Sequence, residues 1–68
     1  MPKKLRELKA MLSQAGFTFR SGKGSHTVWK HPKLASRITL SGKDGDDAKP
    51  YQERDVTNAV RLAKEQGQ

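Results

Sequence analysis

A predicted β-hairpin occupies residues 16–31, GFTFRSGKGSHTVWKH. Its first half, residues 17–20, alternates apolar and polar side chains, as a half-buried strand does. Phe17 and Phe19 are therefore expected to face the core together. The glycines within residues 21–25 favour a tight turn that brings the chain back antiparallel to itself.

A second strand is expected over residues 26–31, because the next residue is a proline and cannot donate a hydrogen bond to a neighbouring strand. Alternation places His26 and His31 on opposite faces, so the two imidazoles are not expected to meet, and His31 is interpreted as an exposed surface residue. The pattern does not say which of Val28 and Trp29 is more buried. Trp29 is interpreted as a core aromatic rather than a platform for an RNA base, because the chain has little other apolar material.

The remaining segments predict two helices and a third strand. Apolar residues at helical spacing predict a helix over residues 3–15, ended by Gly16, and another over residues 51–64. Residues 36–40 predict the third strand, and residues 65–68 are expected to form a frayed tail. The predicted fold is α+β with the order α-β-β-β-α, in which two helices cover one face of a three-stranded antiparallel sheet. This arrangement leaves the other face of the sheet and its edges free for a ligand.

The chain is short and has few apolar residues: 68 residues, 32% of them apolar and none of them cysteine. We expect one domain over residues 1–68, with a thin core that no disulfide or thiolate metal site braces. No apolar run approaches the roughly 18–20 residues that span a bilayer, and no signal-peptide pattern is present. Two histidines without cysteine provide too few zinc ligands. The sequence thus predicts a cytoplasmic protein with no membrane partner, no metal and no cofactor.

Positive charge is concentrated in the first two thirds of the chain. Residues 1–43 carry ten Lys and Arg side chains against one acid, whereas residues 44–68 carry four against six. Such an excess favours a polyanion such as RNA as the partner over a merely solubilising surface. The basic residues extend well beyond any one helix, which disfavours a membrane-binding helix.

The glycine-rich turn brings together a cation, a hydroxyl and an imidazole. Glycine lets the backbone approach a ligand closely, and Lys23 supplies a positive charge for a phosphate. His26 can give and take protons near neutral pH. Lys23 is the first candidate for stabilising charge on a phosphate, and Lys30 the second, because alternation places Lys30 on the same face as His26. From the residues alone, a lone histidine is more often structural than catalytic.

The chain resembles the HicA family of mRNA interferase toxins, which belong to type II toxin–antitoxin systems. The resemblance rests on Gly24, Ser25 and His26, which match the family's glycine-serine-histidine motif, on the Ala-Gly-Phe of residues 15–17, and on the Lys-Pro of residues 49–50. It implies a fold like a double-stranded-RNA-binding domain, ribonuclease activity on mRNA and neutralisation by a HicB-type antitoxin. It also implies that His26 is catalytic, with Gly24 and Ser25 beside it at the RNA.

Two departures from the family pattern are present. Thr27 stands where a second histidine often follows the first, and residues 44–52 are acidic and differ from the commonest family ending. The second departure bears on the antitoxin contacts and on the RNA path near the last helix. Two other functions stay open: a non-catalytic RNA-binding module in which His26 only contacts phosphate or ribose, and a structural partner of an acidic protein.

Overall fold

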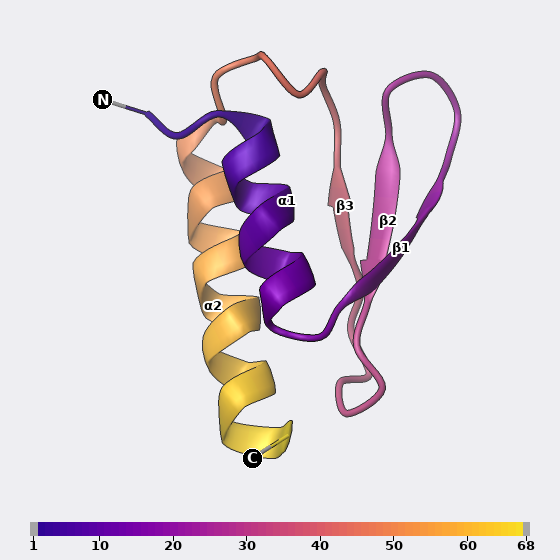
Figure 1. The fold of residues 1–68 in the computed structure, drawn as a ribbon, viewed down its shortest axis with the longest axis vertical. Helices are drawn as coiled ribbons and strands as arrows, with labels where there is room; N and C mark the ends of the chain where they lie inside the picture. Colours follow the sequence, from indigo (N-terminus) through magenta and orange to yellow (C-terminus); the bar gives the residue numbers. More distant parts are fainter. Residues whose placement is uncertain (1, 68) are drawn as a thin grey trace.

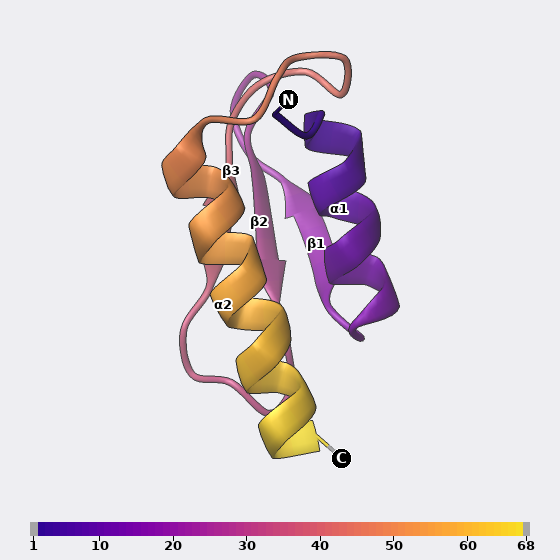
Figure 2. The same ribbon diagram turned by 90° about the vertical axis from the view of Figure 1, so that its left-hand side faces the viewer.

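Two helices lie on one face of a three-stranded antiparallel sheet (Figures 1 and 2). The computed structural model describes residues 2–67. The strand order is β1-β2-β3, so β2 is central and the other two strands are edges. The predicted α-β-β-β-α order is confirmed, while the likeness to double-stranded-RNA-binding domains stays a prediction. The elements are α1 (Leu5–Gln14), β1 (Thr18–Ser21), β2 (Thr27–Lys30), β3 (Ile38–Leu40) and α2 (Pro50–Gly67).

Helix α1 ends in a Schellman motif that directs the chain into β1. Gly16 has a φ of 95°, a conformation that glycine adopts readily. Its N–H donates to the carbonyl of Ser13 (N to O 3.1 Å), and the N–H of Phe17 donates to the carbonyl of Leu12 (3.0 Å). Phe17 and Leu12 are both buried, so the apolar contact typical of this motif anchors the start of the hairpin in the core.

The acidic loop before α2 docks on the N-terminus of α1. The N–H of Leu5 donates to the carbonyl of Asp46 (2.9 Å), and the N–H of Arg6 donates to that of Asp44 (3.2 Å). These bonds satisfy helix N–H groups that have no partner within the helix. The carboxylates of the loop form two ion pairs, Asp44 with Lys9 of α1 and Asp47 with the N-cap residue Lys4, each with an N–O distance of 2.6 Å.

Trp29 is the largest fully buried side chain, with 1% of its surface exposed. Its indole N–H donates to the hydroxyl of Thr27 (2.9 Å), so the polar end of the ring is satisfied within the core. The interpretation of Trp29 as a core aromatic is therefore confirmed. Its neighbour Val28 is only partly buried. The other buried apolar side chains are Leu5, Leu8, Leu12, Phe17, Leu40, Ala48, Val56, Ala59 and Ala63.

Phe19 contradicts the prediction that it faces the core together with Phe17. It lies opposite Trp29 in the β1–β2 register and stacks on that ring, with 4.7 Å between ring centroids, yet it is 58% exposed. The reason is its position on the sheet. The edge strand β1 lies on the opposite side of the sheet from β3, the strand that α2 contacts, so the covered part of the sheet ends at Trp29.

Gln52 fixes the beginning of α2. Its side-chain oxygen accepts the N–H of Lys49 (2.8 Å), as a residue at the third helical position does in a capping box. Its side-chain nitrogen donates to the carbonyl of Ser41 (3.1 Å), just after β3. Pro50 occupies the first helical position, where a missing N–H has no cost. Gln52 is 3% exposed, so it is a buried link between α2 and the sheet.

Helix α2 extends further than predicted. The sequence pattern ended it at Lys64, with a frayed tail over residues 65–68, whereas the helix continues to Gly67. An ion pair between Arg61 and Glu65 (3.1 Å), one helical turn apart, spans the expected end. Residue 68 lies outside the described residues. Within residues 2–67, no helix has the length and apolarity needed to cross a bilayer.

Candidate functional site

The turn between β1 and β2 presents His26 at one end of the sheet. The N–H of Gly22 donates to the carbonyl of His26 (2.8 Å), and the N–H of His26 donates to the carbonyl of Lys23 (3.1 Å). Gly24 occupies the first central position of this turn with a φ of 60°, as in a type II′ turn. A residue with a Cβ pays about 1–2 kcal/mol for that conformation. The conformation of the turn therefore explains why the residue before Ser25 and His26 is a glycine.

One ring nitrogen of the exposed His26 is held by the turn itself. Nδ1 lies 2.9 Å from the carbonyl oxygen of Lys23. Because a carbonyl oxygen only accepts hydrogen bonds, this contact places the proton on Nδ1. The neutral ring then keeps its lone pair on Nε2, the nitrogen that points away from the bond. His26 is thereby oriented to take a proton at Nε2.

The structure brings together three of the four predicted phosphate-binding residues. Lys23, Gly24 and Ser25 form the turn with His26, and the hydroxyl of Ser25 accepts the N–H of Gly42 (3.1 Å), which ties the turn to the loop after β3. Lys30 lies at the far end of β2. It shares a face with His26, but four residues of strand separate the two backbones by about 13 Å.

His31 is half-buried, in contrast to its interpretation as an exposed surface residue. Its ring packs edge-on against Phe17, with 5.0 Å between centroids and 60° between planes. Its Nδ1 accepts the N–H of Lys33 (3.0 Å). His31 lies beyond the opposite end of β2 from His26, so the prediction that the two imidazoles do not meet agrees with the structure.

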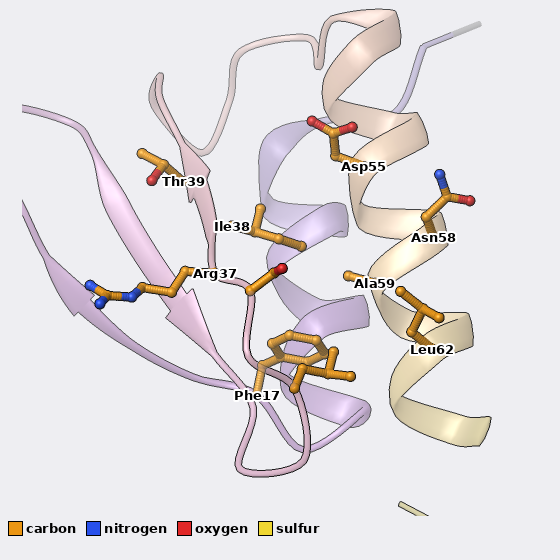
Figure 3. A pocket seen from close by; sticks show the side chains of 10 residues that line it. Phe17, Arg37, Ile38, Thr39, Asp55, Asn58, Ala59 and Leu62 are labelled. Carbon is orange, nitrogen blue, oxygen red and sulfur yellow. The ribbon is translucent and has the colours of Figure 1, made fainter. Parts of the chain in front are cut away.

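Sequence reasoning missed two cations that share the uncovered face of the sheet. Arg20 is paired with Val28 in the β1–β2 register, and both side chains face away from the helices. Arg37 directly precedes β3, and Figure 3 shows it and Thr39 pointing away from α2 while Ile38 points toward it. Alternation within each strand could have predicted that Arg20 and Arg37 face away from the helices. Only the register between strands brings them together.

A groove between β3 and α2 lies apart from the turn (Figure 3). Half of its lining residues are apolar and half are polar, with Arg37 on the β3 side and Asp55 and Asn58 on the α2 side, and His26 is not among them. The groove contains no histidine. Within the part of the chain that the structure describes, no three His, Cys, Asp or Glu side chains gather to hold a metal ion.

Comparison with protein families assigns the chain. A family model described as the HicA toxin of bacterial toxin-antitoxin matches residues 5–66, from the start of α1 almost to the end of α2. The chain belongs to the HicA toxin family. A search of curated proteins and a search of solved structures gave no significant match. HicA proteins are the toxins of toxin–antitoxin systems and are generally ribonucleases, so membership implies an antitoxin partner.

Within the HicA family pattern, the departure at Thr27 has a structural explanation. Thr27 is 8% exposed and accepts the indole N–H of Trp29, so position 27 faces the helices. A side chain there points away from the face that His26 shares, and the motif histidine is left as the one imidazole of the turn. The other departure, residues 44–52, comprises the acidic loop that bonds to the N-terminus of α1 and the first turn of α2, so it belongs to the helix layer.

Proposed function

We propose that this HicA-family toxin is a metal-independent endoribonuclease that cleaves mRNA with His26 as the general base. The main support is the hydrogen bond of the exposed imidazole: Nδ1 of His26 is bonded to the Lys23 carbonyl, which leaves the lone pair of the neutral ring on Nε2. Among residues 2–67, Nε2 of His26 has no hydrogen-bond partner, which fits proton transfer better than a packing role. His31, in contrast, has a packing role against Phe17.

The proposed reaction needs one proton acceptor and a ribose 2′-OH. Nε2 of His26 removes the 2′-OH proton while the 2′ oxygen forms a bond to the adjacent phosphorus. The bond between phosphorus and the 5′ oxygen of the next nucleotide breaks, and that oxygen takes a proton from water or from the imidazolium of His26. The products are a 2′,3′-cyclic phosphate and a 5′-hydroxyl end. DNA lacks the 2′-OH and is not cleaved.

Charge that develops on the phosphate requires donors near His26. Lys23 is adjacent in the turn and carries an exposed ammonium group. Gly24 lets the backbone of the turn approach a phosphate closely, because no Cβ projects from it and nothing lies within 4 Å of that position. Preorganised donors of this kind stabilise a transition state more than they stabilise the ground state. We therefore assign phosphate binding to the turn, with Lys23 as its principal cation.

The test is cleavage of a purified mRNA in EDTA by the wild type, His26→Ala and His31→Gln. General base catalysis predicts that His26→Ala loses about 10²–10⁴-fold in rate. His31→Gln removes the other imidazole and is expected to keep its cleavage rate at a temperature where circular dichroism shows it folded. A 2′-deoxy substitution at the mapped cleavage position is expected to abolish cutting there.

Three outcomes separate the alternatives. Loss of cleavage in a folded His26→Ala that still binds RNA supports the proposal. RNA binding by both proteins with cleavage by neither indicates the non-catalytic RNA-binding module instead. Cleavage that survives His26→Ala, or that disappears in EDTA, contradicts the proposed mechanism.

We assign neutralisation to a HicB-type antitoxin on the basis of family membership and surface charge. The chain carries a net charge of +7, and an acidic partner that covers the basic hairpin would stabilise the fold while blocking the site. The product of the neighbouring gene is expected to copurify with this chain and to suppress cleavage. A neighbouring protein that binds without affecting cleavage would contradict neutralisation at this site.

A further inference from the structure

The uncovered face of the sheet carries one cation on β1, one on β2 and one directly before β3. In the β1–β2 register Arg20 pairs with Val28, and in the β2–β3 register Val28 pairs with Thr39. The next row on the same face contains Thr18 and Lys30, and the β2–β3 register extended by one residue places Arg37 beside Lys30. The described residues with exposed polar side chains on this face are Thr18, Arg20, Lys30, Arg37 and Thr39.

The three cations lie close together. Side chains directly opposite each other on one face have Cβ atoms about 5 Å apart, and the β2–β3 register extended one residue beyond Trp29 and Ile38 gives Lys30 and Arg37 this relation. Diagonal neighbours are about 7–8 Å apart, which is the relation of Arg20 to Lys30. Lys30 and Arg37 also line one shallow hollow together with Thr18 and the loop of residues 31–36. Like charges opposite each other destabilise a sheet, and a bound anion would remove that cost.

No acid balances these cations on their own face. All seven Asp and Glu residues lie on the helices or in the loop of residues 44–47. The ion pairs found among the described residues involve Lys4, Lys9 and Arg61, so none of them engages the sheet cations.

We infer that Arg20, Lys30 and Arg37 form a phosphate track on the open face of the sheet, which binds a single RNA strand next to the bond held at His26. The inference rests on the proposed ribonuclease function and extends its substrate site along β2. Same-face rows repeat about every 6.6 Å along a strand, close to the spacing of successive phosphates in an extended single strand. Both arginines can donate to a phosphate through two N–H groups at once.

Single-stranded RNA fits this face better than a duplex does. A double-stranded-RNA-binding domain spans about 16 base pairs and contacts two successive minor grooves. The phosphate track is one short group of three cations on a flat face. Val28 is the apolar residue at its centre, and no aromatic side chain of the described strands projects there to stack a base. Phosphate contacts without base contacts give weak sequence preference along the track.

The test measures binding of a single-stranded oligoribonucleotide by proteins that all carry His26→Ala, so that cleavage does not affect the result. Arg20→Gln, Lys30→Gln and Arg37→Gln are compared with Arg54→Gln, which removes the same charge from the exposed surface of α2. Each track variant is expected to weaken binding about 3–10-fold and to reduce the slope of log K against log[salt] by about 0.7. Arg54→Gln is expected to stay within about twofold of the parent, because a distant charge adds only a screened contribution.

Each outcome bears on the inference separately from the catalytic proposal. Wild type that fails to cleave, with weakened binding in the track variants, supports the track and rejects the catalysis. Wild type that cleaves, with track variants that bind like Arg54→Gln, rejects the track and leaves the catalysis intact. Equal affinity for the single-stranded oligoribonucleotide and for a 20-base-pair RNA duplex contradicts the preference for a single strand. Track variants that bind RNA like the parent overturn the inference. If the same variants bind the antitoxin more weakly in a parallel measurement, this face belongs to the antitoxin.

Discussion

The side chains of the consecutive residues His26 and Thr27 point to opposite faces of the hairpin. His26 belongs to the turn and reaches solvent, while Thr27 begins β2 and points to the helices, where its hydroxyl accepts the indole N–H of Trp29. The exchange of a histidine for threonine at position 27 thus concerns the core. A buried donor that finds an acceptor two residues away in the same strand fixes the orientation of the largest core ring.

We predict that Thr27→Val destabilises the fold by about 1–3 kcal/mol, the usual cost of a buried donor left without a partner. Valine has nearly the shape of threonine, so the change tests the hydrogen bond rather than packing. Thr39→Val makes the same substitution on the exposed face of β3 and is expected to change stability by less than about 0.5 kcal/mol. Urea unfolding of the three proteins measures the difference, and equal values for both variants would contradict the role of the bond.

At the scale of elements, the sequence pattern predicts which residues form strands and which side of a strand each faces. In β3, alternation gives Ile38 and Leu40 the same face, and Leu40 is buried in the core while Ile38 is partly buried against it. It failed for Phe19, because alternation gives a face but does not say whether a helix covers that part of the sheet. For the same reason the half-buried His31 could not be predicted, since its partner Phe17 lies just before the first strand.

The candidate site also has features that the sequence predicts and features that it does not. The turn that holds His26 was predictable, because glycine spacing and the motif lie within one short stretch. The hydrogen bond between Nδ1 of His26 and the Lys23 carbonyl depends on the exact turn geometry, which composition does not specify. The placement of Arg20 and Arg37 beside Lys30 depends on the register of three strands, which is set by contacts between distant segments.

The side chain of Gln52 is the buried link from α2 to the sheet. Gln52→Ala removes the partner of both the Lys49 N–H and the Ser41 carbonyl, and we expect a loss of about 1–3 kcal/mol. Gln14→Ala, at the exposed end of α1, makes the same chemical change and is expected to cost less than about 0.5 kcal/mol. Urea unfolding compares the two, and a neutral Gln52→Ala would show that other contacts hold the start of α2.

At the scale of the whole molecule, charge is divided between the two layers. The helix layer and its acidic loop contain all the carboxylates, while the open face of the sheet contains cations without acids. The net charge of +7 acts against the compact state through mutual repulsion. The ion pairs of the described residues are solvent-accessible, so each adds little stability.

We therefore predict that NaCl raises the stability of the fold and lowers its affinity for RNA. Raising NaCl from about 50 to 500 mM screens the repulsion between the positive charges. The melting temperature is expected to rise by about 4–8 °C for each kcal/mol of repulsion that the salt removes. RNA affinity is expected to fall over the same range. Chloride is preferred to sulfate, which also stabilises proteins by exclusion from their surface. A melting temperature that falls with NaCl would show that the ion pairs outweigh the repulsion.

The separation of carboxylates from the open sheet face also affects how the molecule approaches a polyanion. The helix layer carries cations together with all seven Asp and Glu side chains, whereas the sheet carries cations alone, so the protein has an electric dipole whose positive end is the sheet. The field of an RNA strand exerts a torque on that dipole before any contact forms, and it turns the sheet toward the strand during diffusion. We therefore expect most encounters to begin with the sheet and the His26 turn already facing the RNA, so that little time is lost to collisions on the helix side.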